Sequence, residues 1–179
     1  TLTLGGMSGY RDAAIEAMAR ECARAIDEEG CIPSRNPAEL LEIFAILTYT
    51  ATQLSEAGRI VPASHRDAIE RIAPRLRTLR HADGGLARFH GGGRGSAGRL
   101  DAALAASGIR SRDIQGRSLG FLRLSGGRTS VIVDAAPPPL GAASLHAHAS
   151  TLAFEMTRGQ DPLIVSCGSG EVYGPSWAR

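Results

Sequence analysis

Lysine is absent from this 179-residue sequence, so all 20 basic side chains are arginines. Set against 18 acidic residues, they leave a formal net charge of only +2. A charge this small argues against nucleic acid or an anionic membrane surface as the partner. Long apolar runs are also missing, which argues against a membrane-spanning helix. Arginine does suit two-point contacts to carboxylate and sulfate groups.

Cysteine is scarce as well, with Cys22, Cys31 and Cys167 lying far apart. An odd count without paired spacing argues against a disulfide framework, and no CxxC metal signature is present. We therefore expect three free thiols. The sequence starts at Thr1, without an initiator methionine or a signal-like segment, so we expect a trimmed or partial chain. It does not decide between periplasm and cytoplasm.

The first half has the apolar periodicity of helices. Apolar residues recur at three- and four-residue steps over 10–29, and we expect Gly30 to end that helix. A second helix is predicted after Asn36, with Pro37 in its first turn and Glu39 completing a capping box. The buried stripe of this second helix is predicted to contain Leu40, Ile43, Phe44 and Leu47. A third helix is predicted to bury Ile69, Ile72, Leu76 and Leu79.

After about Leu119 the period changes to two. The segments "LGFLRLS", "TSVIVDA", "STLAFEM" and "PLIVSCG" predict short antiparallel strands, because no helix separates them. The glycine-rich segment "GGGRGSAG" lacks the lysine of a phosphate-binding loop and predicts a flexible connection. We divide the chain into a helical part (1–90), a connection (91–117) and the beginning of a β-domain (118–179).

Four segments in this order carry a family resemblance: "SRNPAELLEIF", "LRHADGGLARFHG", "GFLRLSGGRTSVIVDAAPPP" and "AHASTLAFEMTRGQDPLIVSCG". Together they resemble the heparinase II/III family of polysaccharide lyases, in particular its uncharacterised bacterial branch. The resemblance implies an α+β multidomain fold. In that fold, part of an incomplete α/α toroid is followed by the first strands of an antiparallel β-sandwich, and the active cleft lies between them.

The resemblance also implies a reaction, the β-elimination of a uronic-acid polysaccharide. Such a lyase removes the proton at C5 and expels the sugar linked through O4. An amide, imidazole or guanidinium must neutralise the carboxylate, and a base must take the proton. Glycoside hydrolysis would instead need two facing carboxylates. Since the acidic residues mostly fall on predicted helix surfaces, we favour elimination.

The resemblance places candidate residues in two segments. His146 matches a catalytic histidine of the family's HxHxD stretch, and the alternative is a structural histidine. Arg35 and Asn36 lie where relatives line the cleft and are candidate catalytic residues, although Asn36 also suits a helix cap. Glu39 stands where many relatives carry a catalytic tyrosine, and is a candidate for substrate binding. Arg88 is a second such candidate, facing an acidic sugar.

The same resemblance bears on a structural metal. His148 would help to hold it, but the usual aspartate partners are replaced by Ser150 and Ser166, and a hydroxyl is a poor zinc ligand. We therefore expect no cofactor. For His81 and His90, which flank "ADGGLARF", we expect positions in a surface loop. Cys31 stands where relatives of this branch tend to have histidine.

Two hypotheses follow. One is a lyase, or part of one, that cleaves a uronic-acid polymer. The other is a lyase-like protein that binds acidic glycans without cleaving them, as the missing tyrosine and the replaced carboxylate suggest. In both, the partner is an acidic polysaccharide, and the chain packs against the remainder of the same polypeptide or a second copy.

Overall fold

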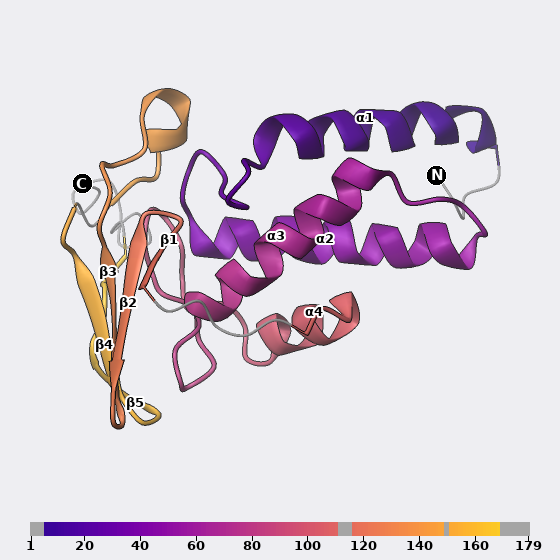
Figure 1. Ribbon diagram of the computed structural model, residues 1–179. Coiled ribbons are helices and arrows are strands. Elements are labelled where there is room, and N and C mark those ends of the chain that lie inside the picture. Colours follow the sequence, from indigo (N-terminus) through magenta and orange to yellow (C-terminus); the bar gives the residue numbers. More distant parts are fainter. Residues whose placement is uncertain (1–5, 111–115, 149–150, 169–179) are drawn as a thin grey trace.

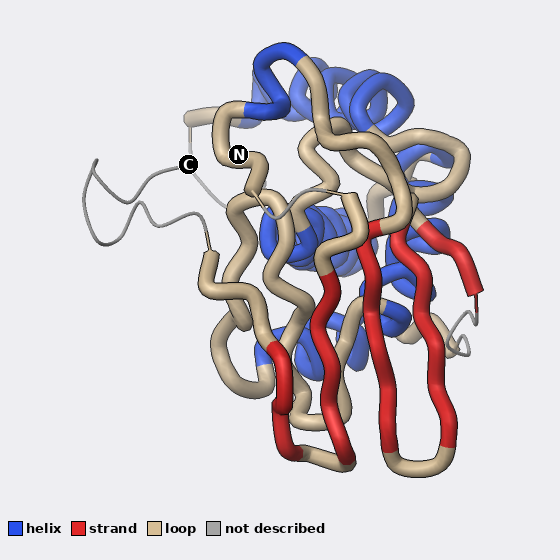
Figure 2. Tube along the Cα trace, turned by 90° about the vertical axis from the view of Figure 1, so that its left-hand side faces the viewer, coloured by secondary structure: helices blue, strands red, loops and turns tan. Residues whose placement is uncertain are grey.

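The structure, a computed structural model, describes residues 6–110, 116–148 and 151–168. A helical layer comes first in the chain, and a five-stranded antiparallel sheet follows in the order β1-β2-β3-β4-β5. Figure 1 shows the helices on one side of the sheet, which is seen nearly edge-on. Figure 2 shows the opposite face of the sheet turned towards the viewer, with the helices behind it. Within the described ranges, no helix has the length and apolar character needed to cross a bilayer.

Within the described part of the chain, the helical layer contains four α-helices and a 3-10 turn at its start. Their bounds are Ser8–Tyr10 for η1, Arg11–Ala25 for α1, Pro37–Glu56 for α2, Ala63–Thr78 for α3 and Arg99–Ser107 for α4. The predicted N-cap of α2 is confirmed, because Asn36 Oδ1 accepts hydrogen bonds from the N–H groups of Ala38 and Glu39. Glu39 does not close the box directly. Its carboxylate accepts from Ser34 Oγ at 2.5 Å, and Ser34 Oγ accepts from the Asn36 N–H.

Two predictions about the helices are wrong. The first helix ends at Ala25 and not near Glu29, because Ile26 is extended and buried. Gly30 has a φ of +79° and packs against the backbone of α3 at Arg71, where a Cβ would come within 2.7 Å of the carbonyl group. The connection predicted over 91–117 contains α4, so only part of it is irregular.

Burial follows the predicted alternation in two of the strands, Thr129–Asp134 and Phe154–Arg158. Their bounds are Gly116–Ser118 for β1, Phe121–Gly126 for β2, Thr129–Asp134 for β3, Phe154–Arg158 for β4 and Asp161–Ile164 for β5, and the 3-10 turn η2 spans Gly141–Ser144. The strand β1 was not predicted. In β3 the buried residues are Ser130, Ile132 and Asp134, each at every second position. This face of the sheet packs against the helices.

One buried cluster connects the helices with the sheet. It joins Phe44 of α2, Ile72 of α3 and Leu104 of α4 to Phe121 and Ile132 of the sheet. Phe121 and Phe89 stack with their ring centroids 5.1 Å apart. Burial of such side chains contributes about 1.5–3 kcal/mol each. The helices and the sheet are therefore held in a fixed relation by a shared core.

Candidate functional site

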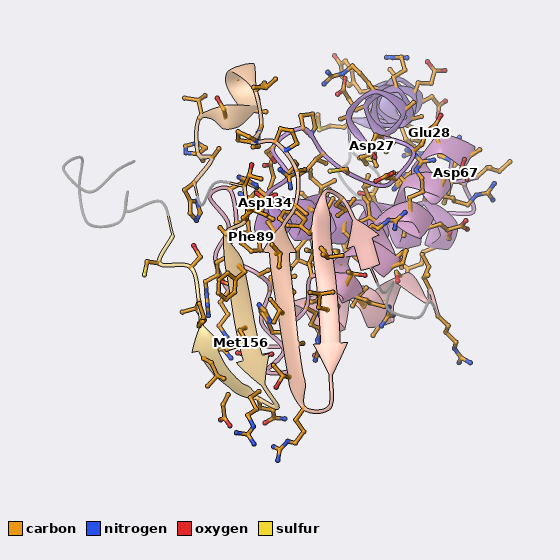
Figure 3. All side chains as sticks on the ribbon, turned by 60° about the vertical axis from the view of Figure 1, so that its left-hand side comes forward. Asp27, Glu28, Asp67, Phe89, Asp134 and Met156 are labelled. Atoms are coloured by element: carbon orange, nitrogen blue, oxygen red, sulfur yellow. The ribbon has the colours of Figure 1, made fainter. Side chains whose placement is uncertain are left out.

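Two fully buried acidic side chains lie on the helix-facing side of the sheet. Asp134 on β3 and Glu155 on β4 both have 0% exposure. Figure 3 labels Asp134 near the upper end of the sheet. A buried carboxylate is costly unless cations and hydrogen-bond donors surround it. Asp134 and Glu155 each have cationic side chains and hydrogen-bond donors around them.

Asp134 is held by one arginine and one histidine. Its Oδ1 accepts from Arg35 at 2.5 Å, and its Oδ2 lies 2.8 Å from His90 Nε2. Burial raises the pKa of Asp134, but the contacts with His90 and Arg35 outweigh it, so the pKa lies below its ordinary value. Asp134 is therefore the anionic centre of the junction between helices and sheet.

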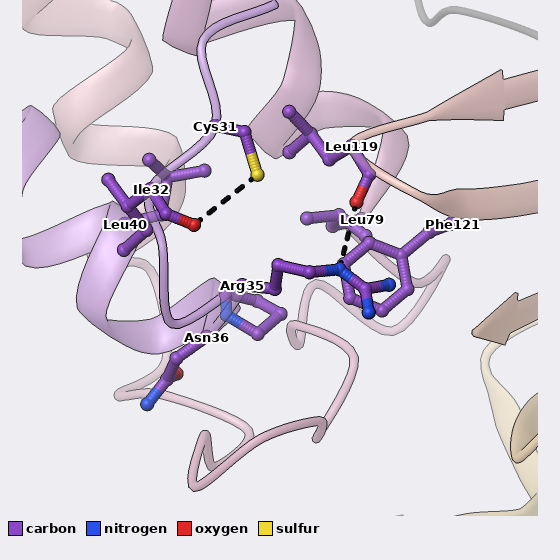
Figure 4. Close-up of a pocket in the computed structure, with 9 residues that line it drawn as sticks. Cys31, Ile32, Arg35, Asn36, Leu40, Leu79, Leu119 and Phe121 are labelled. Atoms are coloured by element: carbon purple, nitrogen blue, oxygen red, sulfur yellow. Dashed lines mark hydrogen bonds between the residues drawn. The ribbon is translucent and has the colours of Figure 1, made fainter. Parts of the chain in front are cut away.

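Arg35 has its guanidinium fixed inside this junction. It donates to the carbonyl oxygens of Leu119, Gly120 and Pro137, and its Cζ lies 4.7 Å from the centre of the Phe121 ring. Figure 4 shows Arg35 extended towards Phe121 and Asn36 pointing away from it. Although the two residues are adjacent in sequence, the structure does not bring them into one site.

Glu155 has a matching environment. His81 Nε2 lies 2.7 Å from Oε2, Arg88 lies 3.5 Å from Oε1, and Oε1 also accepts from the N–H of Ser166 at 2.8 Å. Burial raises the pKa of Glu155, but these partners lower it by more, and the net pKa is below its ordinary value. Arg88, a predicted substrate-binding residue, is thus paired with a buried carboxylate.

His148 joins this network to a glycine turn. Its Nδ1 accepts from the N–H of Gly91 at 2.7 Å, and its Nε2 lies 3.3 Å from Ser166 Oγ. Because Nδ1 accepts, we assign the proton of the neutral ring to Nε2, which then donates to Ser166. The two hydrogen bonds fix the orientation of the His148 ring.

Asn36 and His146 meet at the same turn. Gly91 has a φ of +88°, and a Cβ there would lie 2.8 Å from His146 Cβ and 3.4 Å from Asn36 Nδ2. The next residue, Gly92, has equally little space, because a Cβ on Gly92 would lie 2.6 Å from Asn36 Oδ1. Glycine is therefore required at both positions. The Gly91 site, as we call it, comprises Asn36, Gly91, Gly92, His146 and His148.

Neither His146 nor His148 lies in one of the strands. Instead of lying on an extended strand, His146 lies in a turn after η2, and His148 follows in irregular chain. His146 is exposed, while His148 is partly buried. The proline-rich stretch before η2 breaks the strand period, because proline cannot donate in a ladder. The turn still brings both histidines to the Gly91 site.

The remaining predicted residues lie apart. Glu39 is exposed in the first turn of α2 and accepts from Ser34. Beside His148 is Ser166, and Cys167 is exposed. Ser150 lies outside the described residues. Among the residues that the structure describes, no group of three or more histidine, cysteine or acidic side chains is arranged to hold a metal.

His81, His90, Asp134 and Glu155 were missed as a group. The prediction that both histidines lie on a surface loop is wrong, since they are 4% and 2% exposed. The strand periodicity of the sequence could have predicted that these two carboxylates are buried. Asp134 is in phase with buried Ile132 two residues earlier in β3, and Glu155 opposes Ile132 across the strand pair. An acid on a core face requires buried cations.

The C-terminal part of the chain matches a known family. Residues 109–179 match the sequence profile described as "Heparinase II/III-like, C-terminal". Over these residues the chain is similar to the heparinase II/III-like C-terminal family. The fold agrees over a longer range. A solved heparinase III superposes with a TM-score of 0.72 at 17% identity, covering 93% of this chain and 29% of that one.

Two further relatives extend the heparinase II/III-like comparison. The heparan sulfate lyase HepC from Pedobacter heparinus superposes with a TM-score of 0.65 at 14% identity, over 93% of this chain and 30% of that one. FtsZ-localized protein C from Caulobacter vibrioides (strain NA1000 / CB15N) is 35% identical over 159 residues, which are 88% of this chain and 27% of that protein. The chain thus spans between a quarter and a third of the length of these relatives.

Proposed function

We propose that the Gly91 site binds an acidic polysaccharide and cleaves it by β-elimination next to a uronic acid. The observation that carries this proposal is the meeting of Asn36 and His146 at Gly91, 110 residues apart in the chain. One comes from the start of α2 and the other from the segment between β3 and β4. A sugar lying across this junction would contact both.

Each side chain has a distinct role in this proposal. Asn36 Oδ1 is occupied by the first N–H groups of α2, whereas its Nδ2 makes no hydrogen bond among the described residues. The amide N–H can therefore donate to the uronate carboxylate and stabilise the charge that develops on it. The exposed His146 takes the C5 proton, a C4–C5 double bond forms, and the O4-linked sugar leaves with a proton.

The wider architecture belongs to the same proposal. We infer that α1 to α4 form part of an α/α toroid and that the sheet is one layer of a β-sandwich. The outer face of the sheet supports this, because cross-strand neighbours on it are apolar: Leu122, Leu124, Val131, Val133, Phe154 and Met156. Leu124 and Phe154 are 52% and 43% exposed. A second sheet would remove this face from water.

The substitution Asn36→Asp tests the proposed role of Asn36. Aspartate is as good an N-cap as asparagine, so the free energy of unfolding should change by no more than about 0.3 kcal/mol. It removes the amide donor and places a negative charge near the uronate. We expect the formation of unsaturated uronide, followed by ultraviolet absorbance, to fall about 100-fold. Thr52→Asp, on an exposed part of the same helix, controls for charge and should keep full activity.

A second candidate function is binding without cleavage. Glu39 stands where many family members have a tyrosine base, and the relative from Caulobacter is named for its localisation with FtsZ and not for an activity. This candidate predicts salt-sensitive binding of polyuronate with no absorbance change. Absence of binding at low salt would exclude it together with the lyase.

A further inference from the structure

A charged pocket lies apart from the Gly91 site. It opens between the end of α3, α4 and β2, and has a volume of about 380 Å³. Arg77, Arg80 and Arg123 line it, with His81 and Asp101. None of the residues of the Gly91 site lines it. Its function is therefore a separate question from lyase activity.

The arginines are anchored by part of their donors. Arg123 donates to the carbonyl oxygens of Thr78 and Arg80, and Arg77 donates to that of Ile109. These bonds satisfy carbonyls at the end of α3 and after α4. The guanidinium groups are thus held in fixed positions around the pocket.

Two arginine donors at the pocket have no acceptor among the described residues. The Nε atoms of Arg77 and Arg80 are buried, and the described residues provide no hydrogen-bond partner for either. His81 also lines the pocket; it is 4% exposed, and its Nε2 faces Glu155. Buried polar groups are almost always paired in native proteins. Two unpaired guanidinium donors on residues that line one pocket indicate a missing acceptor.

The charges determine which acceptor fits. Three guanidinium groups face a single carboxylate, Asp101, which is 3.0 Å from Arg80 and 58% exposed. Planar N–H forks bind tetrahedral oxyanions by two-point contacts. We propose that this pocket binds a phosphate or sulfate group, either as the free ion or as the head group of a larger ligand.

Calorimetric titration of the protein with inorganic phosphate and inorganic sulfate, at constant ionic strength, tests this proposal. We expect saturable binding of at least one of the two ions, and the ratio of their affinities identifies the preferred group. Acetate, a planar monovalent anion, should bind at least about tenfold more weakly. Absence of saturable binding of both tetrahedral ions would overturn the proposal.

Variants separate the pocket from the overall charge. Arg77→Gln should weaken binding about tenfold by removing one charge-assisted contact. Arg66→Gln, an exposed position on the same helix, should leave it unchanged. Asp101→Asn should tighten binding, because it removes the competing carboxylate, and a misfolded variant could not produce that gain. Equal effects of Arg66→Gln and Arg77→Gln, or no gain in Asp101→Asn, would contradict a built site.

Discussion

Substituting Asp134 by asparagine should destabilise the protein by removing the anion that pairs with Arg35 and His90. The two partners are 11% and 1% exposed in their side chains. Breaking a buried ion pair typically costs about 3–5 kcal/mol. Here Arg35 keeps its bonds to three backbone carbonyl oxygens, and an amide oxygen can still accept from it. We therefore expect a loss of about 2–3 kcal/mol in the free energy of unfolding.

Urea unfolding measures this loss, and Asp161→Asn provides the control. Asp161 is an exposed acid on β5, where the same substitution should change stability by less than about 0.5 kcal/mol. A double-mutant cycle with Arg35→Met should show a coupling of about 1.5–3 kcal/mol. Strictly additive effects, or a loss in Asp134→Asn no larger than in Asp161→Asn, would refute the view that this cluster holds the helices to the sheet.

Three further outcomes follow from the structure. Asp134 and Glu155 have pKa values below those of unfolded carboxyl groups. The stability that they confer is therefore complete above about pH 5 and should be lost as the pH falls through their folded pKa values. An unfolding free energy that does not change with pH in this acidic range would contradict this. Burial raises the pKa of Cys31 to about 11, so a thiol reagent at neutral pH should modify exposed Cys167 first, and equal rates would be the opposing result. Finally, Asn36→Ala should lower the unfolding free energy by about 1 kcal/mol in chemical denaturation, whereas an unchanged midpoint would argue against the cap.

The features that sequence predicted well depend on local chemistry. Asn36 followed by Pro37 has the signature of a helix start, and the structure places the cap there. The alternation in "TSVIVDA" gave β3 within one residue. The resemblance, supported by several ordered segments, identified the family that the profile also matches. Local pattern and segment order were sufficient for these.

The missed features depend on contacts between distant segments. His81 pairs with Glu155 over 74 residues, and Gly91 contacts His148 over 57. Nothing near His81 in the sequence shows that an acid will cover it, so a surface loop was the natural expectation. The helix α4 is short and begins after a glycine, and its apolar Leu100 and Leu104 alone gave too weak a period. Tertiary pairing decided these positions.

The outcome for Arg35 depends on its backbone conformation. The family resemblance suggested a shared cleft for Arg35 and Asn36, because both lie where relatives line the cleft. Arg35, however, has a positive φ of 52°, and its side chain is directed to the sheet. The backbone conformation, which the sequence does not show, separates the two side chains.

The central claim is that the Gly91 site cleaves a uronic-acid polysaccharide, with His146 as the base. The most direct measurement is ultraviolet absorbance of unsaturated uronide, formed from uronate polymers by the protein as purified from its source. We predict a rise that His146→Ala reduces at least about 100-fold and that Leu145→Ala, at an exposed neighbouring position, leaves intact. No rise with any uronate polymer, or an equal rise in His146→Ala, would contradict the claim.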